Sequence, residues 1–355
     1  MGELRFVGLD VHKKMIAFCE KQADGRIIEE GTLLATRAAL ACWTRQRQTS
    51  WAGGLEATLF TGWIYDFLKP YAVDLKVGHP LMLRAICSGK KKSDKIDARK
   101  LADLLRCNLF PQAYMAPETI RDLRRVLRFR NLMVRQAVRM KNKTAGLLME
   151  CGVEYEKRRL HGRAYFADLL ETLEDIPPSL PLLLNMSRAT IETIDTAQKR
   201  LVVALKTDPR LSRRVQLLTS IPGVGEVTAL TWALEIGPVD RFPTIAHAIS
   251  YCGLCSDQRE SAGKAQRTPL SKQRNRFLQS ALIEAAKLAP QWNSQLAALR
   301  ARVLETSHHN QASIAIARKL VAYLMAVDRS GIPFRLQSAK PEAKEDSMLS
   351  TVQCA

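Results

Sequence analysis

The first hundred residues alternate between short apolar runs with strand patterns and longer segments with helical periodicity. The second and third runs are separated by the turn-forming pair Asp24-Gly25, which is typical of a hairpin. The expected strands are 5–11, 15–20, 26–34, 51–56 and 73–77, and the expected helices are 37–48, 61–71 and 93–106. Ser93 is suited to cap the last helix. The pattern predicts a mixed α/β domain over residues 1–110.

Beyond residue 110 the periodicity is mainly helical. A long amphipathic segment covers 118–143, and three prolines, Pro177, Pro178 and Pro181, precede a second long helix over 186–206. Further on, the expected features are two helical patterns around a turn at 221–225, a polar loop over 258–272 and an apolar helix over 275–288. We expect a helical connector over 111–210 with coiled-coil pairing as one option, a mostly helical domain over 211–330 and a disordered polar tail over 331–355.

Length and charge narrow the class of protein. The chain has 355 residues and 46% hydrophobic content, enough for a folded protein of two or three domains. Its 54 Lys and Arg against 35 Asp and Glu give a net charge of +19, which suits a polyanionic partner, although an unrelated basic protein is the alternative. No apolar run reaches the roughly 20 residues of a membrane span. We expect a cytoplasmic protein with reduced cysteines and, at Cys252 and Cys255, no zinc site.

Four carboxylates stand out against this basic background. Asp10 lies inside the apolar run 6–11, and a buried acid is costly unless it is paired or bound to a cation. Three strands followed by alternating helices and strands resemble the ribonuclease-H-like arrangement, in which Asp10 and Glu56 would meet at one edge of the sheet. Asp94 and Asp97 are three apart, so one helix face carries both. Together they predict a site for two Mg²⁺ ions, which lie about 4 Å apart and need several carboxylates to hold them.

The alternative for the helical pair is that it only balances neighbouring basic side chains on a solvated face. Nine basic residues against two acids make the segment 118–143 a basic helix. It can lie along nucleic acid, pack against a partner helix, or do both, and a merely solvated helix is the remaining choice. The turn at 221–225 can offer backbone N–H groups to a phosphate, as in helix-hairpin-helix modules, or can be a simple interhelical turn. The predicted nucleic-acid contacts are Lys13, Lys14, Lys90, Lys91, Lys92, Arg121, Arg124, Arg125, Arg128, Arg135, Arg139, Gly223, Gly225, Arg259, Lys264, Arg267 and Lys272.

A family resemblance rests on motifs that occur in a fixed order. These are Leu9-Asp10-Val11-His12-Lys13-Lys14, Glu56, the block Lys92-Ser93-Asp94-Lys95-Ile96-Asp97-Ala98-Arg99, the turn Ile221-Pro222-Gly223-Val224-Gly225 and the stretch from Gly253-Leu254 to Asn275. With them the chain, from about residue 5 to about residue 325, resembles the DEDD transposases of bacterial insertion sequences, family one hundred and ten. The block around Asp94 is the most specific part. The resemblance implies a RuvC-like N-terminal domain and a C-terminal transposase domain.

The resemblance also implies a reaction. The four acids would bind Mg²⁺, with Mn²⁺ as a possible substitute, and a serine would attack DNA to form a covalent phosphoserine. Ser261 matches that serine by motif position, with Lys272 and Asn275 after it, whereas spacing alone makes Ser261 a loop serine. The chain departs from the family pattern at Ser256, around Ser261 and at Arg274. Homo-oligomers, a dimer or a tetramer, would share active sites between subunits, and a noncoding guide RNA would pair with the DNA.

We therefore expect a transposase that cuts and rejoins DNA. Arg259, Lys264 and Arg267 would hold the scissile strand, because phosphate contacts position DNA without reading its sequence. One alternative is a RuvC-like structure-specific endonuclease that uses a metal-activated water. The other is a nucleic-acid-binding protein without chemistry, for which the basic helix and the glycine turn suffice.

Overall fold

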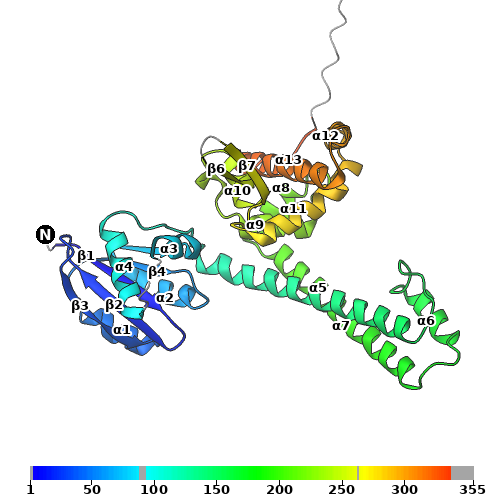
Figure 1. Ribbon diagram of the computed structural model, residues 1–355, viewed down its shortest axis with the longest axis horizontal. Helices are drawn as coiled ribbons and strands as arrows, with labels where there is room; N and C mark the ends of the chain where they lie inside the picture. Colours follow the sequence, from blue (N-terminus) through cyan, green and yellow to red (C-terminus); the bar gives the residue numbers. More distant parts are fainter. Residues whose placement is uncertain (1–2, 88–92, 262–263, 337–355) are drawn as a thin grey trace, which may run out of the picture. The chain divides into compact units, whose positions relative to one another are not determined.

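The computed structural model describes residues 3–87, 93–261 and 264–336, with the backbone alone at 257–261 and 264–268 (Figure 1). The predicted contacts Lys90, Lys91 and Lys92 and the predicted tail beyond residue 336 lie outside these residues. Contacts between residues divide the chain into two compact units, Met1–Leu123 and Arg124–Ala355. None of the helices in the described part of the chain is long and apolar enough to cross a bilayer.

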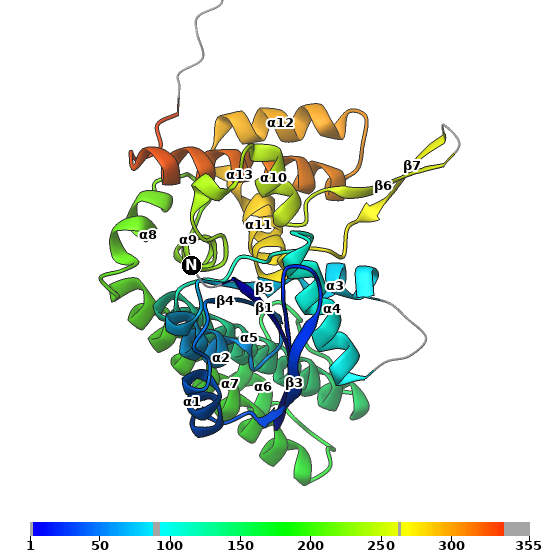
Figure 2. The same cartoon turned by 90° about the vertical axis from the view of Figure 1, so that its left-hand side faces the viewer.

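The N-terminal unit is built on a five-stranded sheet (Figure 2). Its strands are β1 (Arg5–Val11), β2 (Met15–Lys21), β3 (Ile27–Leu34), β4 (Trp51–Glu56) and β5 (Asp74–Gly78). The order is β3-β2-β1-β4-β5; β1, β2 and β3 pair antiparallel, while β4 lies parallel to β1 and to β5. The five predicted strands are confirmed within two residues at each end. This mixed α/β topology is compatible with a ribonuclease-H-like domain.

Helices cover both faces of the sheet. They are α1 (Arg37–Arg45), α2 (Thr61–Leu68), α3 (Pro80–Cys87), α4 (Asp94–Arg106) and the short 3-10 helix η1 (Lys69–Tyr71). Side chains alternate along a strand, so Val7 and Leu9 point into the core that α1 and α2 share, around Trp43 and Ile64. Gly8 and Asp10 consequently lie on the opposite face, which α4 covers. The helix α3 was not predicted.

A close approach between β1 and α4 depends on Gly8. A Cβ atom added at Gly8 would lie 2.0 Å from the carbonyl oxygen of Ala98 and 2.9 Å from the Cβ of Leu101. No side chain fits at that distance, so glycine lets the helix lie directly on the strand. The start of α4 is thereby held beside the end of β1.

The C-terminal unit begins within the long helix α5 (Glu118–Glu150), which extends the predicted basic helix to 33 residues. Its far end packs with α6 (Arg163–Glu171) and with the start of α7 (Ser179–Thr207), around Leu148, Phe166 and Leu184 (Figure 1). The predicted start of the second long helix at 186 is wrong. Pro178 is the N-cap of α7 and Pro181 lies in its first turn, where a missing N–H costs no helical hydrogen bond.

The rest of this unit is a helical domain with one hairpin. It contains α8 (Ser212–Leu218), α9 (Glu226–Glu235), α10 (Ile245–Tyr251), β6 (Ser256–Ser261), β7 (Lys264–Leu270), α11 (Arg276–Leu288), α12 (Ser294–Leu304), α13 (His309–Ser330) and the 3-10 helices η2 (Val239–Arg241) and η3 (Ala289–Gln291). The helix α13 supplies much of the core, including the buried Ile316, Leu320 and Leu324. Asp328 on α13 also receives two hydrogen bonds from Arg214 of α8, at 2.8 and 2.6 Å.

The polar loop predicted over 258–272 is wrong for most of its length. The strands β6 and β7 pair antiparallel, from Ser256 opposite Leu270 to Ser261 opposite Lys264. A backbone hydrogen bond of 3.0 Å from Ser271 to the Cys255 carbonyl closes the base of this hairpin. The segment lacks the alternation of apolar and polar residues by which a half-buried strand is recognised, so the sequence pattern did not indicate these strands.

Candidate metal centre and serine hairpin

Asp10 and Glu56 lie at the ends of two neighbouring parallel strands. The register pairs Leu9 of β1 with Leu55 of β4, so the next residue of each strand is an acid at the same edge of the sheet. Asp10 is buried, with 9% of its surface exposed, and Glu56 is partly buried. The predicted convergence of these two strand ends is therefore confirmed at the backbone level.

The first turn of α4 brings two more acids to this edge. The Ser93 hydroxyl accepts a hydrogen bond of 3.3 Å from the Ile96 amide, which confirms Ser93 as the N-cap. Asp94 and Asp97 follow in the first turn, where the helix dipole favours negative charge. The close packing of α4 on Gly8 sets the position of this turn.

His12 joins this site, although spacing did not single it out. Its Nε2 atom lies 3.1 Å from Oδ2 of Asp10 and 3.5 Å from Oδ1 of Asp94. One ligand atom from each of these three residues lies within 4.8 Å of the others, a grouping that can hold a metal ion. The available signal was the spacing of Asp10 and His12, because residues two apart in an extended chain point to the same side.

The electrostatics of Asp10 fit a bound cation. Burial raises the pKa of Asp10, the neighbouring His12 lowers it, and the charges of Asp94 and Asp97 raise it again. An ionised Asp10 is therefore held in a desolvated place among other acids, which a divalent ion would neutralise. Carboxylate oxygens also suit Mg²⁺ and Mn²⁺ as ligands.

Glu56 and Asp97 are not part of the tight group around His12. Burial raises the pKa of the Cys87 thiol; Lys100 opposes this, while the charges of Asp97 and Glu56 add to it, so both acids lie near that thiol. Lys100 approaches Asp97, with 3.8 Å between Nζ and Oδ1. The arrangement thus consists of His12 in contact with Asp10 and Asp94, with Asp97 in the same helical turn as Asp94 and Glu56 at the end of the neighbouring strand.

The predicted phosphate contacts differ in their surroundings. Lys13 and Lys14 are exposed in the turn between β1 and β2, and Arg125, Arg135 and Arg139 are exposed on α5. For these residues nucleic-acid binding stays a prediction. Arg121 instead forms an ion pair with Asp66 of α2, inside the N-terminal unit, so its guanidinium serves the fold.

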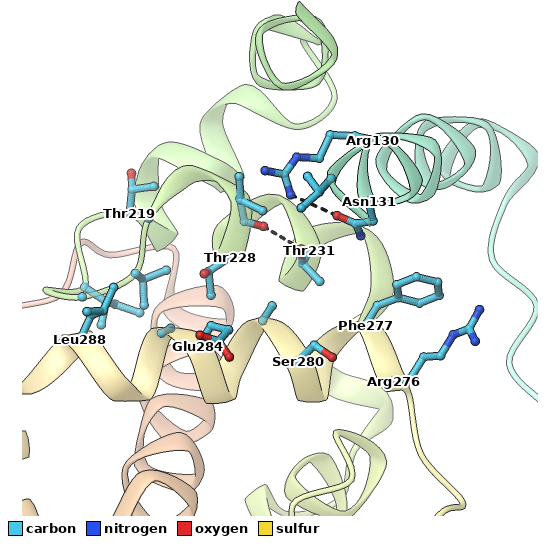
Figure 3. Close-up of a pocket in the computed structure, with 18 of the residues that line it drawn as sticks. Arg130, Asn131, Thr219, Thr228, Thr231, Arg276, Phe277, Ser280, Glu284 and Leu288 are labelled. Atoms are coloured by element: carbon cyan, nitrogen blue, oxygen red, sulfur yellow. Dashed lines mark hydrogen bonds between the residues drawn. The ribbon is translucent and has the colours of Figure 1, made fainter. Parts of the chain in front are cut away.

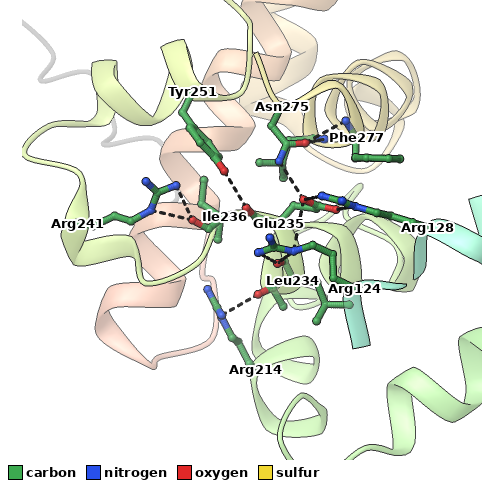
Figure 4. A network of polar contacts seen from close by, with 12 residues as sticks. Arg124, Arg128, Arg214, Leu234, Glu235, Ile236, Arg241, Tyr251, Asn275 and Phe277 are labelled. Atoms are coloured by element: carbon green, nitrogen blue, oxygen red, sulfur yellow. Dashed lines mark hydrogen bonds and ion pairs between the residues drawn. The ribbon is translucent and has the colours of Figure 1, made fainter. Parts of the chain in front are cut away.

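Arg124 and Arg128 also have internal partners, and these centre on an acid that the sequence did not reveal (Figure 4). Glu235 is fully buried and accepts two hydrogen bonds from Arg128, at 2.8 and 2.9 Å, and one of 3.0 Å from the amide of Asn275. Arg124 donates to the Leu234 carbonyl at 2.9 and 2.7 Å. A buried carboxylate needs such partners, so these arginines hold α5 against α9 and α11.

Ser261 is the last residue of β6, beside the end of the hairpin. Arg259 pairs with Gln266 and Arg267 with Gln258, so the predicted strand-holding residues share this hairpin. Asn275, which follows the hairpin, links it to the buried Glu235 through its side-chain amide. The backbone N–H of Asn275 donates to the Tyr251 carbonyl at 3.0 Å, and its side-chain oxygen caps α11. Lys272, exposed, follows the hairpin.

The glycine turn lies between α8 and α9. Gly223 has a φ of +91°, and a Cβ atom there would lie 2.4 Å from the Cβ of Ala289. The backbone conformation and the close approach each require glycine at this position, whether or not the turn binds a phosphate. Gly225 is the N-cap of α9, where no side chain caps the first turn. Phosphate binding at this turn stays a prediction.

Comparisons with known proteins agree with these features. A family described as Transposase, of the DEDD type, matches residues 7–152, and one described as Transposase IS116/IS110/IS902 family matches residues 215–301. The first match covers the sheet and the acids; the second spans the turn, the hairpin and α11.

The individual relatives share little sequence identity with this chain, but the matches cover most of its length. A probable family 20 transposase of Pseudomonas aeruginosa is 26% identical over 66% of this chain and 72% of its own length. The transposase for insertion sequence element IS1111A of Coxiella burnetii is 24% identical over 81% of this chain and 78% of its own length. The transposase for insertion sequence element IS1328 of Yersinia enterocolitica is 24% identical over 68% of this chain and 73% of its own length. The chain belongs to the IS110 family of DEDD transposases and is a DNA transposase.

Proposed function

We propose that this transposase cuts and rejoins DNA at the ends of an insertion sequence through a RuvC-like acid cluster and the serine Ser261. The observation that carries the proposal is the contact of His12 with the buried Asp10 and with Asp94, at the edge where Glu56 ends its strand. A desolvated carboxylate in such a place needs a cation. The family to which the chain belongs supports DNA as the substrate.

Asp10, Glu56, Asp94 and Asp97 would hold Mg²⁺, with Mn²⁺ as a substitute. When bound, the metal supplies Lewis-acid stabilisation of the charge that develops on the phosphate oxygens. The residues of the chain orient the phosphate: Asp10 is fixed by its strand, and Asp94 by the capped start of α4. Rigid elements of this kind hold a reacting group in place better than loops do.

The proposed chemical step conserves the number of phosphoester bonds. The Ser261 oxygen forms a new bond to phosphorus, its proton passes to a base, and the bridging P–O bond to the DNA sugar breaks to release a hydroxyl. Attack of a hydroxyl from another strand on the phosphoserine reverses these events and rejoins the DNA. Because the bond energy is kept in the serine ester, rejoining needs no nucleotide cofactor. Arg259, Lys264, Arg267 and Lys272 would hold the strand.

We further propose a noncoding guide RNA and a homo-oligomer as partners. The charge of +19 and the exposed residues Arg125, Arg135 and Arg139 on α5 support a polyanion along that helix. RNA pairing would select DNA sequence, since phosphate contacts do not.

One experiment tests the reaction. Purified protein is incubated with element-junction DNA, candidate RNA and Mg²⁺, and a denaturant-stable protein–DNA adduct is sought. We expect the adduct with wild type, and none with Asp10→Asn or Ser261→Ala. An adduct that persists in Ser261→Ala would reject that serine. Free cleaved ends without an adduct would favour the endonuclease with a metal-activated water, and full function in Asp10→Asn would favour a protein without chemistry.

A further inference from the structure

A cavity of about 1120 Å³ opens in the C-terminal unit and takes no part in the metal centre (Figure 3). Its walls come from α5, from α9 and the turn before it, from α11 and from Trp292. Sites for small ligands usually occupy about 300–1,000 Å³. This cavity is therefore large enough for a short segment of a polymer.

Basic side chains outnumber acidic ones in the lining of the cavity. Arg130, Arg135 and Arg276 contribute to the lining, against a single acidic lining residue in the described part of the chain, Glu284. Figure 3 shows Arg130 on α5, with its guanidinium beside Thr231, and Arg276 at the start of α11, next to Phe277. The Nε atom of Arg130 is buried and has no hydrogen-bond partner within the described residues. Because this buried atom is out of reach of a ligand in the cavity, phosphate contacts would come from the outer guanidinium nitrogens of the lining arginines.

The part of the cavity near the end of α11 is apolar and open to solvent. Leu288 and Trp292 line it with 51% and 58% of their surfaces exposed, beside the buried Val224. An indole and an isobutyl side chain left exposed together mark a contact surface. A flat aromatic face also suits stacking with a nucleobase.

We infer that this cavity binds unpaired nucleotides of a nucleic acid, with bases at the Leu288 and Trp292 end and phosphates at the three arginines. The inference rests on the proposed function, because it identifies a further contact of the transposase with its nucleic acid. Unpaired nucleotides carry both an apolar face and a negative charge on each repeat, which matches a lining that combines arginines with exposed apolar side chains. Bases of an intact duplex are stacked inside and cannot reach an apolar wall.

A helix from another protein is the alternative occupant. An apolar helix would cover the guanidinium groups of Arg130, Arg135 and Arg276 while supplying no acceptor for them. Removing a guanidinium group from water without giving it a hydrogen-bond acceptor costs free energy. The charge of the cavity thus favours nucleotides.

Tryptophan fluorescence gives a direct test. Trp292 is exposed in the cavity, whereas Trp43, Trp51 and Trp232 are buried and Trp63 is partly buried in the N-terminal unit. The full chain is titrated in EDTA with a single-stranded DNA 10-mer, the RNA of the same sequence and a blunt duplex. We expect the single strands to quench the fluorescence, the duplex to quench it much less, and Trp292→Phe to remove the response.

Two substitutions with matched controls measure affinity by fluorescence anisotropy. Ala281→Phe fills the cavity on α11, and Ala298→Phe makes the same change on an exposed position of α12. Arg276→Gln removes a cavity charge, and Arg302→Gln removes an exposed charge on α12. We expect single-strand binding at least about tenfold weaker for each cavity variant and unchanged for its control, with equal melting temperatures.

The outcomes separate the possibilities. Tighter binding of RNA than of DNA assigns the cavity to an unpaired part of the RNA, and the reverse assigns it to a DNA strand; both support the inference. Wild-type affinity in Ala281→Phe and Arg276→Gln overturns it, as does equal quenching by duplex. If the cavity variants differ from wild type in sedimentation coefficient but not in affinity for nucleic acid, the inference is overturned in favour of a protein partner. Because no metal ion or cleavage is involved, Asp10→Asn should bind like wild type, and failure here leaves the proposed reaction intact.

Discussion

At the scale of single residues, the decisive feature is a buried acid with a histidine beside it. The interior placement of Asp10 follows from its apolar strand, and its raised pKa follows first from that burial. His12 lies between Asp10 and Asp94, where a metal ion would also find its ligands. We infer that the His12 imidazole coordinates the metal together with the two acids.

This inference leads to a prediction about metal preference. Imidazole nitrogen suits transition metals better than it suits Mg²⁺. We expect His12→Ala to weaken Mn²⁺ binding about tenfold and to change Mg²⁺ binding less. Calorimetric titration of the metal-free protein measures both affinities, with His309→Ala, an exposed histidine of α13, as the control.

Pulsed electron paramagnetic resonance of the Mn²⁺-loaded protein provides a direct readout. A nitrogen coupling is expected in wild type and in His309→Ala, and none in His12→Ala. A wild-type spectrum without that coupling would exclude the imidazole from the metal's ligands.

At the scale of elements, the position of α4 on β1 assembles the site. Gly8 allows the contact, and an ion pair at the other end of the helix reinforces it: Lys21 of β2 donates to Asp103 at 2.6 Å. Arg106 donates to the same carboxylate at 2.8 Å. The acids of α4 therefore depend on contacts several residues away from the metal centre.

Gly8→Ala tests this dependence. The new methyl group would overlap backbone atoms of α4, so we expect a loss of about 3 kcal/mol in the free energy of unfolding and weaker metal binding. Urea denaturation and calorimetry measure the two effects. Gly146→Ala on α5 is the matched control, because its methyl group would meet nothing within 4 Å and alanine favours a helix. Equal stability of Gly8→Ala and wild type would contradict the close approach.

The pH dependence of the link between β2 and α4 is a separate prediction. Burial alone would raise the pKa of Asp103, but the hydrogen bonds from Lys21 and Arg106 outweigh it and hold the pKa below 3.8. A lowered pKa means that this stabilisation is present above pH 3.8 and is lost as the pH falls through the folded value. The stability difference between wild type and Asp103→Asn should therefore stay constant at neutral and mildly acidic pH and shrink below 3.8. Denaturation at a series of pH values checks this, and a difference that grows in acid would refute it.

At the scale of the whole molecule, the acids and the serine belong to different units. Asp10, Glu56, Asp94 and Asp97 lie in Met1–Leu123, and Ser261 lies in Arg124–Ala355. The proposed reaction therefore needs both units, from one chain or from two. The family resemblance favours two.

Mixing two inactive variants distinguishes these cases. Asp10→Asn keeps its serine, and Ser261→Ala keeps its acids. If each active site combines the acids of one chain with the serine of the other, a mixed dimer has one complete site out of two. With half of the dimers mixed, we expect about a quarter of the wild-type adduct. Gel analysis of the adduct measures this yield, and no adduct in the mixture would assign both groups to one chain.

Much of the N-terminal unit was predictable because its signals are local. Short apolar runs marked the strands, and Ser93 marked the start of α4, since strand burial and helix capping involve residues close in sequence. The hairpin of β6 and β7 gave no such signal, because backbone pairing holds it. The partners of Arg124 and Arg128 were equally hidden, since Glu235 lies more than a hundred residues away.

The amino-acid sequence by itself determined the family, the strand and helix pattern around Asp10, and the basic charge that suits a nucleic acid. Tertiary structure alone decided which charges serve the fold and which surround a site. His12 lies between Asp10 and Asp94 in the candidate metal centre, and three arginines of the basic helix bond to other elements of the fold, through contacts between segments far apart along the chain. Such contacts depend on how elements pack, and packing is a property of the folded chain that no local pattern contains.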